Sequence, residues 1–432
     1  MIGVIADDLT GAAEIGAVGL RHKLRAEVVL AGEPSGEADL VCLDTDSRAC
    51  APGEAAERAA RAARRMRQHR AGWLYKKTDS VLRGNVTPEI EAIVAALGLD
   101  GVLLVPANPS LGRTIVGGHY FVRGQLVHET EFARDPKYPR LSSHVRELVG
   151  TPATLPLLVR RAEEGLPERG IVIGDAANLT DLRQWAALRQ HGWLMAGGAD
   201  FFGALLTEET AGGISQATSE SAHLPLPRRG GEGRRVGERI EEEPRTSNAL
   251  LTLRLSPSEG ERGETDCRPA KELFVCGSAS EVTRDFVARQ KARRVRMFSL
   301  PPEVASGGSF EAGRLTSLVD EVVAGLKGAD RVILHISLPP MKDLAIAEIL
   351  ALHLVRVAEQ VIPLAGVGHV FAEGGATAVG LARQMAWHRF QVTAELAPGV
   401  VTLSPHGGSF TLLTIKPGSY PWPEGIVAGR AP

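Results

Sequence analysis

Two carboxylates stand side by side near the start of the chain, where an apolar run over residues 2–6 stops at Asp7 and Asp8. Thr10 and Gly11 follow at the start of a helical pattern, which predicts a strand that ends in an acidic turn and opens a helix. A carboxylate at a strand end can act as a general base or bind hydroxyl groups, and the alternative is that it only caps the helix. Because two adjacent like charges each need a partner, we favour a chemical role.

Two loops deliver an arginine after a strand-like run. Residues 44–48, Asp-Thr-Asp-Ser-Arg, follow the apolar run 40–43 and end at Arg48, and the loop after residues 102–105 leads to Arg113. The planar fork of a guanidinium group matches a carboxylate or a phosphate. For residues 44–48, an ordinary turn with a surface arginine is an equal alternative. The loop that leads to Arg113, taken alone, is an ordinary loop.

A further loop gathers cations after the strand-like run 73–75. Its candidate site residues are Lys77, Asp79, Ser80 and Arg83. Its positive charges repel one another unless an anion binds, so its composition predicts an anion site rather than a solvated charge run. The carboxyl ends of parallel strands meet at one edge of a sheet, and four loops of this kind therefore predict one shared site.

Two turns rich in small residues lie in the second half of the chain. Residues 276–280 read Cys-Gly-Ser-Ala-Ser and residues 373–378 read Glu-Gly-Gly-Ala-Thr-Ala, each between a strand-like and a helix-like run. Small residues let backbone N–H groups approach a phosphate at a helix N-terminus. Neither turn matches the P-loop or the dinucleotide motif, and a tight strand–helix turn is an equal alternative. The histidines are not spaced as ligand pairs, so we assign no residue to a metal.

Strand-like and helix-like runs alternate along most of the chain, which predicts an α/β fold with helices on the faces of mostly parallel sheets. The alternation stops in a segment rich in Gly, Pro, Arg and Glu, which we expect to be a disordered linker or insertion. We therefore expect two α/β domains, residues 1–212 and 268–432, separated by residues 213–267. An active-site cleft is expected between the two domains.

The bulk composition narrows the classes of function. The chain has 432 residues, a formal net charge of -2, 44% hydrophobic and 23% charged residues, and 4 cysteines without metal spacing. This balance gives no electrostatic case for binding nucleic acid or an anionic membrane. No apolar run reaches the roughly 20 residues of a membrane helix, and Asp7 and Asp8 interrupt any signal-peptide pattern. We expect a cytoplasmic protein that binds small molecules, and a homo-oligomer stays open.

The motifs, taken in order, resemble those of the four-carbon acid sugar kinase family. They are Asp-Asp-Leu-Thr-Gly-Ala at 7–12, Asp-Thr-Asp-Ser-Arg at 44–48, Lys-Lys-Thr-Asp-Ser-Val-Leu-Arg-Gly at 76–84, and Pro-Ala-Asn-Pro with Gly-Arg at 106–113. Gly-His-Tyr at 118–120 and residues 129–136 also match. The resemblance covers nearly the whole chain outside residues 212–268. It implies an N-terminal domain that binds the acid sugar and a C-terminal domain that binds ATP.

The resemblance implies an ATP-dependent kinase of threonate, erythronate or an oxo-tetronate, with ATP and Mg²⁺ as cofactors. The family's ATP contacts map onto Ser278, Ser280, Gly374, Gly375, Ala376, Thr377 and Gly399. We expect the substrate to be held by Arg48, Lys77, Ser80, Arg83 and Arg113. Asp7 or Asp8 would orient and deprotonate the attacking hydroxyl, with Asp79 as a further candidate.

Two other classes of function remain open at this point. The segment from Leu43 to Ser47 looks like the start of a haloacid-dehalogenase-type phosphatase, with Asp44 as the nucleophile. That interpretation leaves the first acidic turn and the whole second domain without a role. The other alternative is a sugar-acid sensor that does not use ATP.

Overall fold

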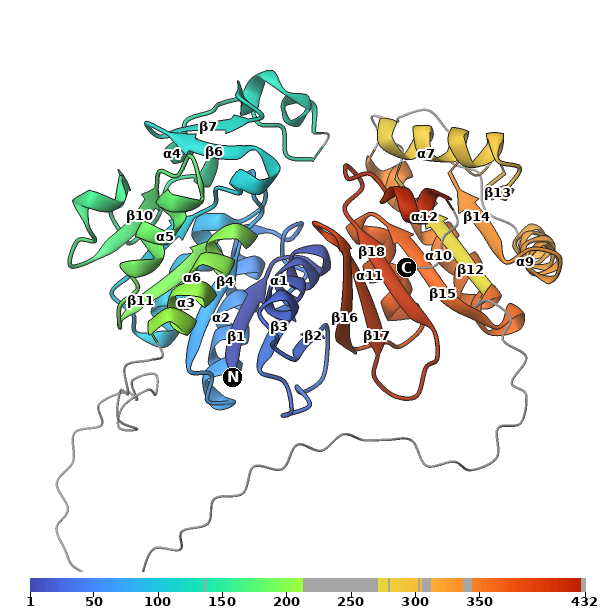
Figure 1. Ribbon diagram of the computed structural model, residues 1–432, viewed down its shortest axis with the longest axis horizontal. Coiled ribbons are helices and arrows are strands. Elements are labelled where there is room, and N and C mark those ends of the chain that lie inside the picture. The colour runs from blue at the N-terminus through green and yellow to red at the C-terminus, as the bar shows by residue number, and fades with distance from the viewer. Residues whose placement is uncertain are drawn as a thin grey trace, which may run out of the picture. The chain divides into compact units, whose positions relative to one another are not determined.

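The computed structural model describes residues 1–135, 137–212, 271–278, 280–301, 304, 312–336 and 344–428, and these form an α/β fold (Figure 1). The linker expected at residues 213–267 lies outside the described residues. We call residues 1–212 the N-terminal half and residues 271–428 the C-terminal half. The alternation of strands and helices predicted for both halves is confirmed.

The strands of the N-terminal half are β1 (Ile2–Ala6), β2 (Ala26–Val29), β3 (Leu40–Asp44), β4 (Trp73–Lys77), β5 (Gly101–Val105), β6 (Arg113–Val116), β7 (His119–Val122), β8 (Gln125–Leu126), β9 (Leu157–Arg160), β10 (Gly170–Gly174) and β11 (Trp193–Gly197). Its α-helices are α1 (Leu9–Arg21), α2 (Pro52–Gln68), α3 (Val86–Leu97), α4 (Val145–Val149), α5 (Leu179–Ala187) and α6 (Ala199–Gly212). Short 3-10 helices are η1 (Pro109–Leu111), η2 (Val127–Glu129), η3 (Glu131–Arg134) and η4 (Ala162–Glu164).

The strands of the C-terminal half are β12 (Lys271–Cys276), β13 (Arg296–Ser299), β14 (Arg331–His335), β15 (Val367–Glu373), β16 (Arg389–Ala397), β17 (Val400–Pro405) and β18 (Leu412–Lys416). Its helices are α7 (Glu281–Ala292), α9 (Ala312–Lys327), α10 (Leu344–Ala365), α11 (Gly375–Gln384) and α12 (Glu424–Ala428).

One sheet of 15 strands runs through both halves, in the order β13-β14-β12-β15-β18-β17-β16-β2-β3-β1-β4-β11-β5-β10-β9. The strands of the N-terminal part, from β2 to β9, are all parallel to their neighbours. The predicted class, a mostly parallel sheet with helices, is therefore confirmed. The C-terminal part is parallel from β13 to β18 and turns antiparallel at β17 and β16.

The junction between the two halves is a strand pair that the sequence did not reveal. Strand β16 pairs antiparallel with β2, and Phe390 lies opposite Val28. Each strand would otherwise present a row of unpaired N–H and C=O groups to solvent, and the pairing satisfies both edges. The two expected sheets are therefore joined edge to edge.

Helix α2 illustrates how the sequence builds a layer on the sheet. Pro52 begins the helix, where its missing N–H costs no hydrogen bond. Ala55, Ala59 and Ala63 recur four residues apart and are fully buried, while Arg61 is exposed and Arg58 donates to the carbonyl oxygens of Thr45 and Asp46. Small side chains on the inner face let the helix approach the sheet closely, and the helix thus covers the strands that carry the acidic loops.

A small three-stranded sheet, β6-β7-β8, is separate from the large one. Strands β7 and β8 form a hairpin, in which Phe121 pairs with Leu126. The third strand, β6, was not predicted, because its residues follow a Pro-rich loop and lack a clear apolar alternation. It pairs with β7 and begins at Arg113, so the small sheet directly carries one of the candidate site residues.

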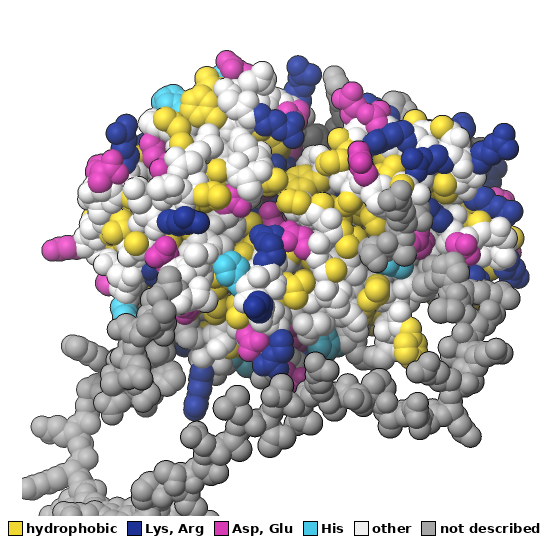
Figure 2. All heavy atoms as spheres, in the orientation of Figure 1, with side chains coloured by type: hydrophobic (Ala, Val, Ile, Leu, Met, Phe, Trp, Pro, Cys, Tyr) yellow, Lys and Arg dark blue, Asp and Glu magenta, His cyan; other side chains and the backbone are white. Residues whose placement is uncertain are grey.

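Acidic and basic side chains both occur on the face drawn in Figure 2, and basic ones are most frequent at the upper right of the view. Within the described ranges, no helix is both long and apolar enough to cross a membrane.

Candidate active site

The loops after β1, β3 and β4 meet at one edge of the sheet, because these three strands are neighbours. In the strand register, Ala6 lies beside Asp44 on one side and beside Lys77 on the other. The residues that follow each strand end therefore start from adjacent positions. The topology explains how acidic and basic residues far apart in the sequence come within contact distance.

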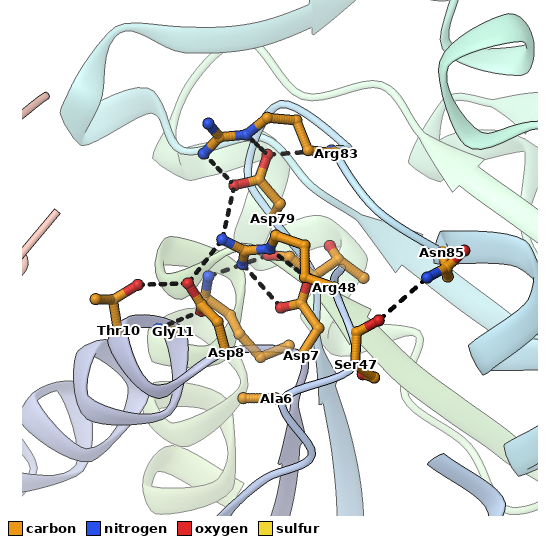
Figure 3. A network of polar contacts seen from close by, with 12 residues as sticks. Ala6, Asp7, Asp8, Thr10, Gly11, Ser47, Arg48, Asp79, Arg83 and Asn85 are labelled. Atoms are coloured by element: carbon orange, nitrogen blue, oxygen red, sulfur yellow. Dashed lines mark hydrogen bonds and ion pairs between the residues drawn. The ribbon is translucent and has the colours of Figure 1, made fainter. Parts of the chain in front are cut away.

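Arg48 is the centre of the resulting cluster (Figure 3). Its Nε and Nη2 atoms donate to the two carboxylate oxygens of Asp7 at 2.8 and 2.9 Å. Its Nη1 donates to Oδ2 of Asp8 at 2.7 Å and lies 3.9 Å from Oδ1 of Asp79. One guanidinium group thus serves three carboxylates from two different loops.

Arg83 holds Asp79 from the other side. Its Nε and Nη2 donate to the two oxygens of Asp79 at 2.9 and 2.8 Å, and its Nη1 donates to Asp135 at 2.9 Å. The sequence did not single out Asp135 as a separate site residue, although it lies in a stretch that carries the family resemblance. The cluster is therefore an alternating chain of carboxylates and guanidinium groups.

These ion pairs control the protonation of the acids. Burial alone would raise the pKa of Asp7, but the Arg48 guanidinium and the Lys76 ammonium outweigh it and hold the pKa below its usual value. Burial would also raise the pKa of Asp79, but the guanidinium groups of Arg83 and then Arg48 outweigh it and keep this pKa well below its ordinary range. Both carboxyl groups are therefore ionised at neutral pH, and neither is a strong proton acceptor while its arginine stays in place.

Asp8 has two structural partners besides Arg48. It is the N-cap of α1, because its Oδ1 accepts the backbone N–H of Gly11 at 2.7 Å. Its Oδ2 also accepts the hydroxyl of Thr10 at 2.6 Å. The capping role that we weighed against chemistry is therefore present at Asp8, and it leaves Asp8 fixed in position beside Arg48.

Lys77 lies beneath α1 with only 4% of its side chain exposed. Its Nζ is 3.0 Å from Oε2 of Glu14 and donates to the carbonyl oxygen of Thr78 at 3.0 Å. Burial would lower the pKa of Lys77, but Glu14 and the nearby aspartates raise it, so the lysine stays charged. No motif pointed to Glu14, because it is a single glutamate within the mostly apolar sequence of α1.

The neighbouring Lys76 points to the opposite side of the strand and has a different partner. Its Nζ lies 2.5 Å from Oε2 of Glu89, and both side chains are almost completely buried at 1% and 2% exposure. Ser47 donates its hydroxyl to Oε1 of the same glutamate at 2.8 Å. Glu89 thus ties α3 both to β4, through Lys76, and to the loop that carries Arg48, through Ser47, and supports the cluster structurally.

Arg113 and Ser80 are brought together, since a guanidinium nitrogen of Arg113 donates to the hydroxyl of Ser80. The guanidinium of Arg113 also lies 5.5 Å from the centroid of the Phe132 ring, and that of Arg83 lies 5.8 Å from the same ring. All the candidate residues of the N-terminal half therefore lie in one charged neighbourhood, and Phe132 is a member that the sequence did not identify.

The first predicted nucleotide turn begins at the end of β12. Ser278 accepts the backbone N–H of Ser280 at 3.2 Å. Ser280 is the N-cap of α7, accepting the N–H of Thr283 at 3.2 Å and donating to the carbonyl oxygen of Gly418 at 2.9 Å. The helix N-terminus that could receive a phosphate is thus built as expected, although the Ser280 hydroxyl is already used to hold it.

The second predicted turn begins α11, with Gly374 as its N-cap at a φ of +91°. Gly375 and Ala376 occupy the first helical positions, and the side chain of Thr377 is buried. A Cβ atom placed on Gly375 would lie 3.7 Å from Oδ2 of Asp8. The turn of the C-terminal half therefore reaches the acidic loop of the N-terminal half.

A buried ion pair lies below both turns and was missed from the sequence. Lys416 Nζ is 2.8 Å from Oε1 of Glu373, and both side chains have 0% exposure. Thr283 donates its hydroxyl to the same oxygen. Glu373 directly precedes Gly374, and Lys416 lies opposite it on the adjacent strand, so the pair joins the end of β15, where the second turn starts, to the end of β18. The Thr283 hydroxyl links α7, which follows the first turn, to the same pair.

Gly399 connects β16 and β17 at a φ of +75°, a left-handed conformation that favours glycine. Among the described residues, no group of three or more His, Cys, Asp or Glu side chains is arranged to hold a metal ion.

Comparison with known proteins divides the chain in the same way. A family model for a sugar-binding N-terminal domain matches residues 2–205, and one for a nucleotide-binding C-terminal domain matches residues 273–420. A solved structure from Salmonella typhimurium, described as a tRNA synthase, superposes with a TM-score of 0.73 at 18% identity and covers 99% of this chain and 98% of its own. At that identity the likeness concerns the fold alone.

Curated relatives carry kinase names. A D-erythronate kinase of Heliobacterium modesticaldum is 36% identical over 41% of this chain and 46% of its own length. A D-threonate kinase of Salmonella typhimurium is 33% identical over 52% of this chain and 60% of its own length, so these alignments span about half of each relative. A 3-oxo-tetronate kinase of Actinobacillus succinogenes is 26% identical over 93% of this chain and 92% of its own length. With both family models matched in order, the resemblance is confirmed: the chain belongs to the four-carbon acid sugar kinase family.

Proposed function

We propose that this protein is an ATP-dependent kinase that phosphorylates a hydroxyl group of a four-carbon sugar acid. The two family models name the two ligands that this reaction needs, a sugar in the N-terminal half and a nucleotide in the C-terminal half. The relatives named above are kinases of erythronate, threonate and 3-oxo-tetronate, which suggests one of these acids as the substrate. The nucleotide would be ATP.

The observation that carries the proposal is the approach of Gly375 to Asp8. A Cβ on Gly375 would lie 3.7 Å from the Asp8 carboxylate. Gly375 is at the N-terminus of α11, where backbone N–H groups and the helix dipole attract a phosphate. A phosphate bound at this turn and a hydroxyl bound at Asp8 would be neighbours, which is the arrangement that in-line phosphoryl transfer requires.

The substrate carboxylate would bind among the cations of the N-terminal half. Arg113 and Ser80 already contact each other, and Arg83 lies over the same Phe132 ring as Arg113. We assign Arg113 and Ser80 to the carboxylate and hydroxyl groups of the acid. Arg48, Lys77 and Arg83 act mainly by holding neighbouring acidic side chains in place, because all three are already engaged with carboxylates of this chain.

Asp8 is the best placed group to orient and deprotonate the attacking hydroxyl. Asp7 and Asp79 each have both oxygens engaged by one guanidinium fork and a lowered pKa. The Asp8 carboxylate accepts hydrogen bonds from Gly11, Thr10 and Arg48. These use three of the roughly four acceptor positions of a carboxylate, so one stays available for the attacking hydroxyl beside Gly375.

Mg²⁺ normally accompanies ATP and neutralises charge on the transferred phosphate. The carboxylates of Asp7, Asp8 and Asp79 are engaged by Arg48 and Arg83, so the described residues do not fit a magnesium cage built by the protein. We expect Mg²⁺ to arrive with ATP, held by phosphate oxygens and water.

The test is a coupled assay of ADP release with D- and L-threonate, D- and L-erythronate and their oxo forms. An Asp8→Asn variant is the matched probe of the base, because asparagine preserves the helix cap. We expect it to lower kcat by about 10²–10⁴-fold while the KM for ATP stays near its original value. Full turnover in Asp8→Asn would exclude this base, and no ADP release with any of these acids would refute the proposed activity.

The two alternatives gain no support. Burial raises the pKa of Asp44 to about 8, so its carboxyl group is mostly protonated at neutral pH and is a weak nucleophile for a phosphatase. No observation favours a sensor over a kinase.

A further inference from the structure

Arg113 receives support from both halves of the chain. Within the N-terminal half its guanidinium contacts the Ser80 hydroxyl and lies over the Phe132 ring. It also lies 5.8 Å from the centroid of the Tyr420 ring, which belongs to the C-terminal half. A guanidinium within about 6 Å of two aromatic rings is attracted by the electron-rich faces of both. Its orientation therefore depends on a residue from the half that carries the nucleotide turns.

Tyr420 is held in place by its own local structure. It lies just beyond β18, in a turn where its backbone N–H donates to the carbonyl oxygen of Pro417 at 3.1 Å. Its ring packs directly on the backbone of Gly399, because a Cβ at that position would lie 2.7 Å from Cε2 of the tyrosine. Even an alanine at residue 399 would collide with the ring. The tyrosine thus contacts one residue assigned to ATP and one assigned to the sugar acid.

The charges around Tyr420 are those of the acid-sugar site. Burial raises the pKa of its phenol, Arg113 opposes that shift, and Glu14, Lys77 and Asp79 are also close enough to act on it. Glu14 and Lys77 are the ion pair beneath α1, and Asp79 is the acid held by Arg83. The tyrosine therefore borders the N-terminal cluster, although it is more than 300 residues away in the sequence.

We infer that Tyr420 is a positioning residue for the sugar acid: its ring, seated on Gly399, directs the Arg113 guanidinium toward the substrate carboxylate. This inference rests on the proposed kinase function and assigns that site a residue from the opposite half of the chain. An arginine that is free to rotate loses part of its binding energy in ordering itself, whereas one that contacts two fixed rings is already oriented. The affinity for the sugar acid therefore depends on the turn after β18, which holds Tyr420 beside Arg113.

The test compares Tyr420→Ala, which removes the ring, with Tyr420→Phe, which keeps the ring and loses only the hydroxyl. Phe410→Ala is the control, since it removes a ring that is 98% exposed from the same half. KM for the sugar acid, KM for ATP and kcat are measured for each, using the acid that the wild-type protein turns over fastest. We expect Tyr420→Ala to raise the KM for the acid about tenfold, in line with the loss of one cation–π contact, and Tyr420→Phe to restore it within about twofold.

The outcomes separate this inference from the proposed function. A wild-type protein that releases no ADP with any four-carbon acid refutes the kinase proposal itself. If the wild type is active and Tyr420→Ala leaves the KM for the acid unchanged, the positioning role is refuted. An equal rise of both KM values together with a lower Tm would show a general structural role and would also overturn the inference. A Tyr420→Phe variant as impaired as Tyr420→Ala would assign the effect to the hydroxyl instead of the ring.

Discussion

Replacing Arg48 by methionine would remove a cation that serves three carboxylates. Asp79 keeps Arg83, and Asp8 keeps Gly11 and Thr10, but Asp7 loses both of the hydrogen bonds that Arg48 donates to its carboxylate. The Asp7 side chain is only 5% exposed, so its charge would remain buried without a direct partner. Removing one member of a buried ion pair costs about 3–5 kcal/mol of unfolding free energy, and we expect Arg48→Met to lose that amount at pH 7.

The loss should depend on pH in a defined direction. In the wild type the pKa of Asp7 is held below its usual value, so its contribution to stability is present at pH 7 and is lost only in strong acid. Without Arg48, burial dominates and raises the pKa of Asp7 above its unfolded value. The folded variant then takes up a proton as the pH falls through that raised pKa. The difference in unfolding free energy between the wild type and Arg48→Met therefore becomes smaller, by up to about 1.4 kcal/mol per pH unit.

The measurement is urea unfolding followed by tryptophan fluorescence at pH 7 and pH 5 for the wild type, Arg48→Met and the double variant Arg48→Met with Asp7→Asn. We expect the double variant to recover much of the lost stability at pH 7, since the buried charge is gone, and to show a smaller dependence on pH. A stability difference that stays constant between the two pH values, or a double variant no more stable than Arg48→Met, would refute the reasoning that Arg48 acts by neutralising Asp7.

Three further outcomes are expected. Glu89→Ala leaves the Lys76 ammonium buried without its carboxylate and should lower the unfolding free energy by about 3–5 kcal/mol in urea, whereas a change below 1 kcal/mol would show that water reaches the lysine. Gly277→Ala places a Cβ 2.1 Å from Oγ1 of Thr377 and should raise the KM for ATP about tenfold with little change for the sugar acid; equal changes in both would contradict a nucleotide-specific turn. Arg383→Ala removes an exposed ion pair between the halves and should change Tm by no more than a few degrees, an effect that added salt would mimic in the wild type.

Much of the site could be predicted because strand ends are readable in a sequence. An apolar run that stops at Asp7 or before Lys77 marks a strand end, and parallel strands place such ends at one edge of the sheet. The loops that follow β1, β3 and β4 were therefore found, and the family motifs identified the same residues. The Gly374 turn was found for a similar reason, since a glycine between a strand and a helix marks a tight approach.

The partners of these residues could not be predicted. Glu14, Glu89 and Glu373 each hold a buried lysine, yet in the sequence they are single glutamates within helical or strand patterns. A buried charge selects its partner by distance through space, and that distance depends on how helices cross the sheet, which local patterns do not encode.

Periodicity and motif spacing are local properties of the chain, and they were enough to predict the fold class, the family and the positions of the acidic and glycine-rich turns. Three features became visible only in the folded molecule: β2 and β16 join the two sheets, Arg48 bridges Asp7 and Asp8, and Tyr420 reaches Arg113. These contacts join residues that are distant in the sequence. They form because unpaired strand edges and buried charges are unfavourable until a partner from elsewhere in the chain satisfies them.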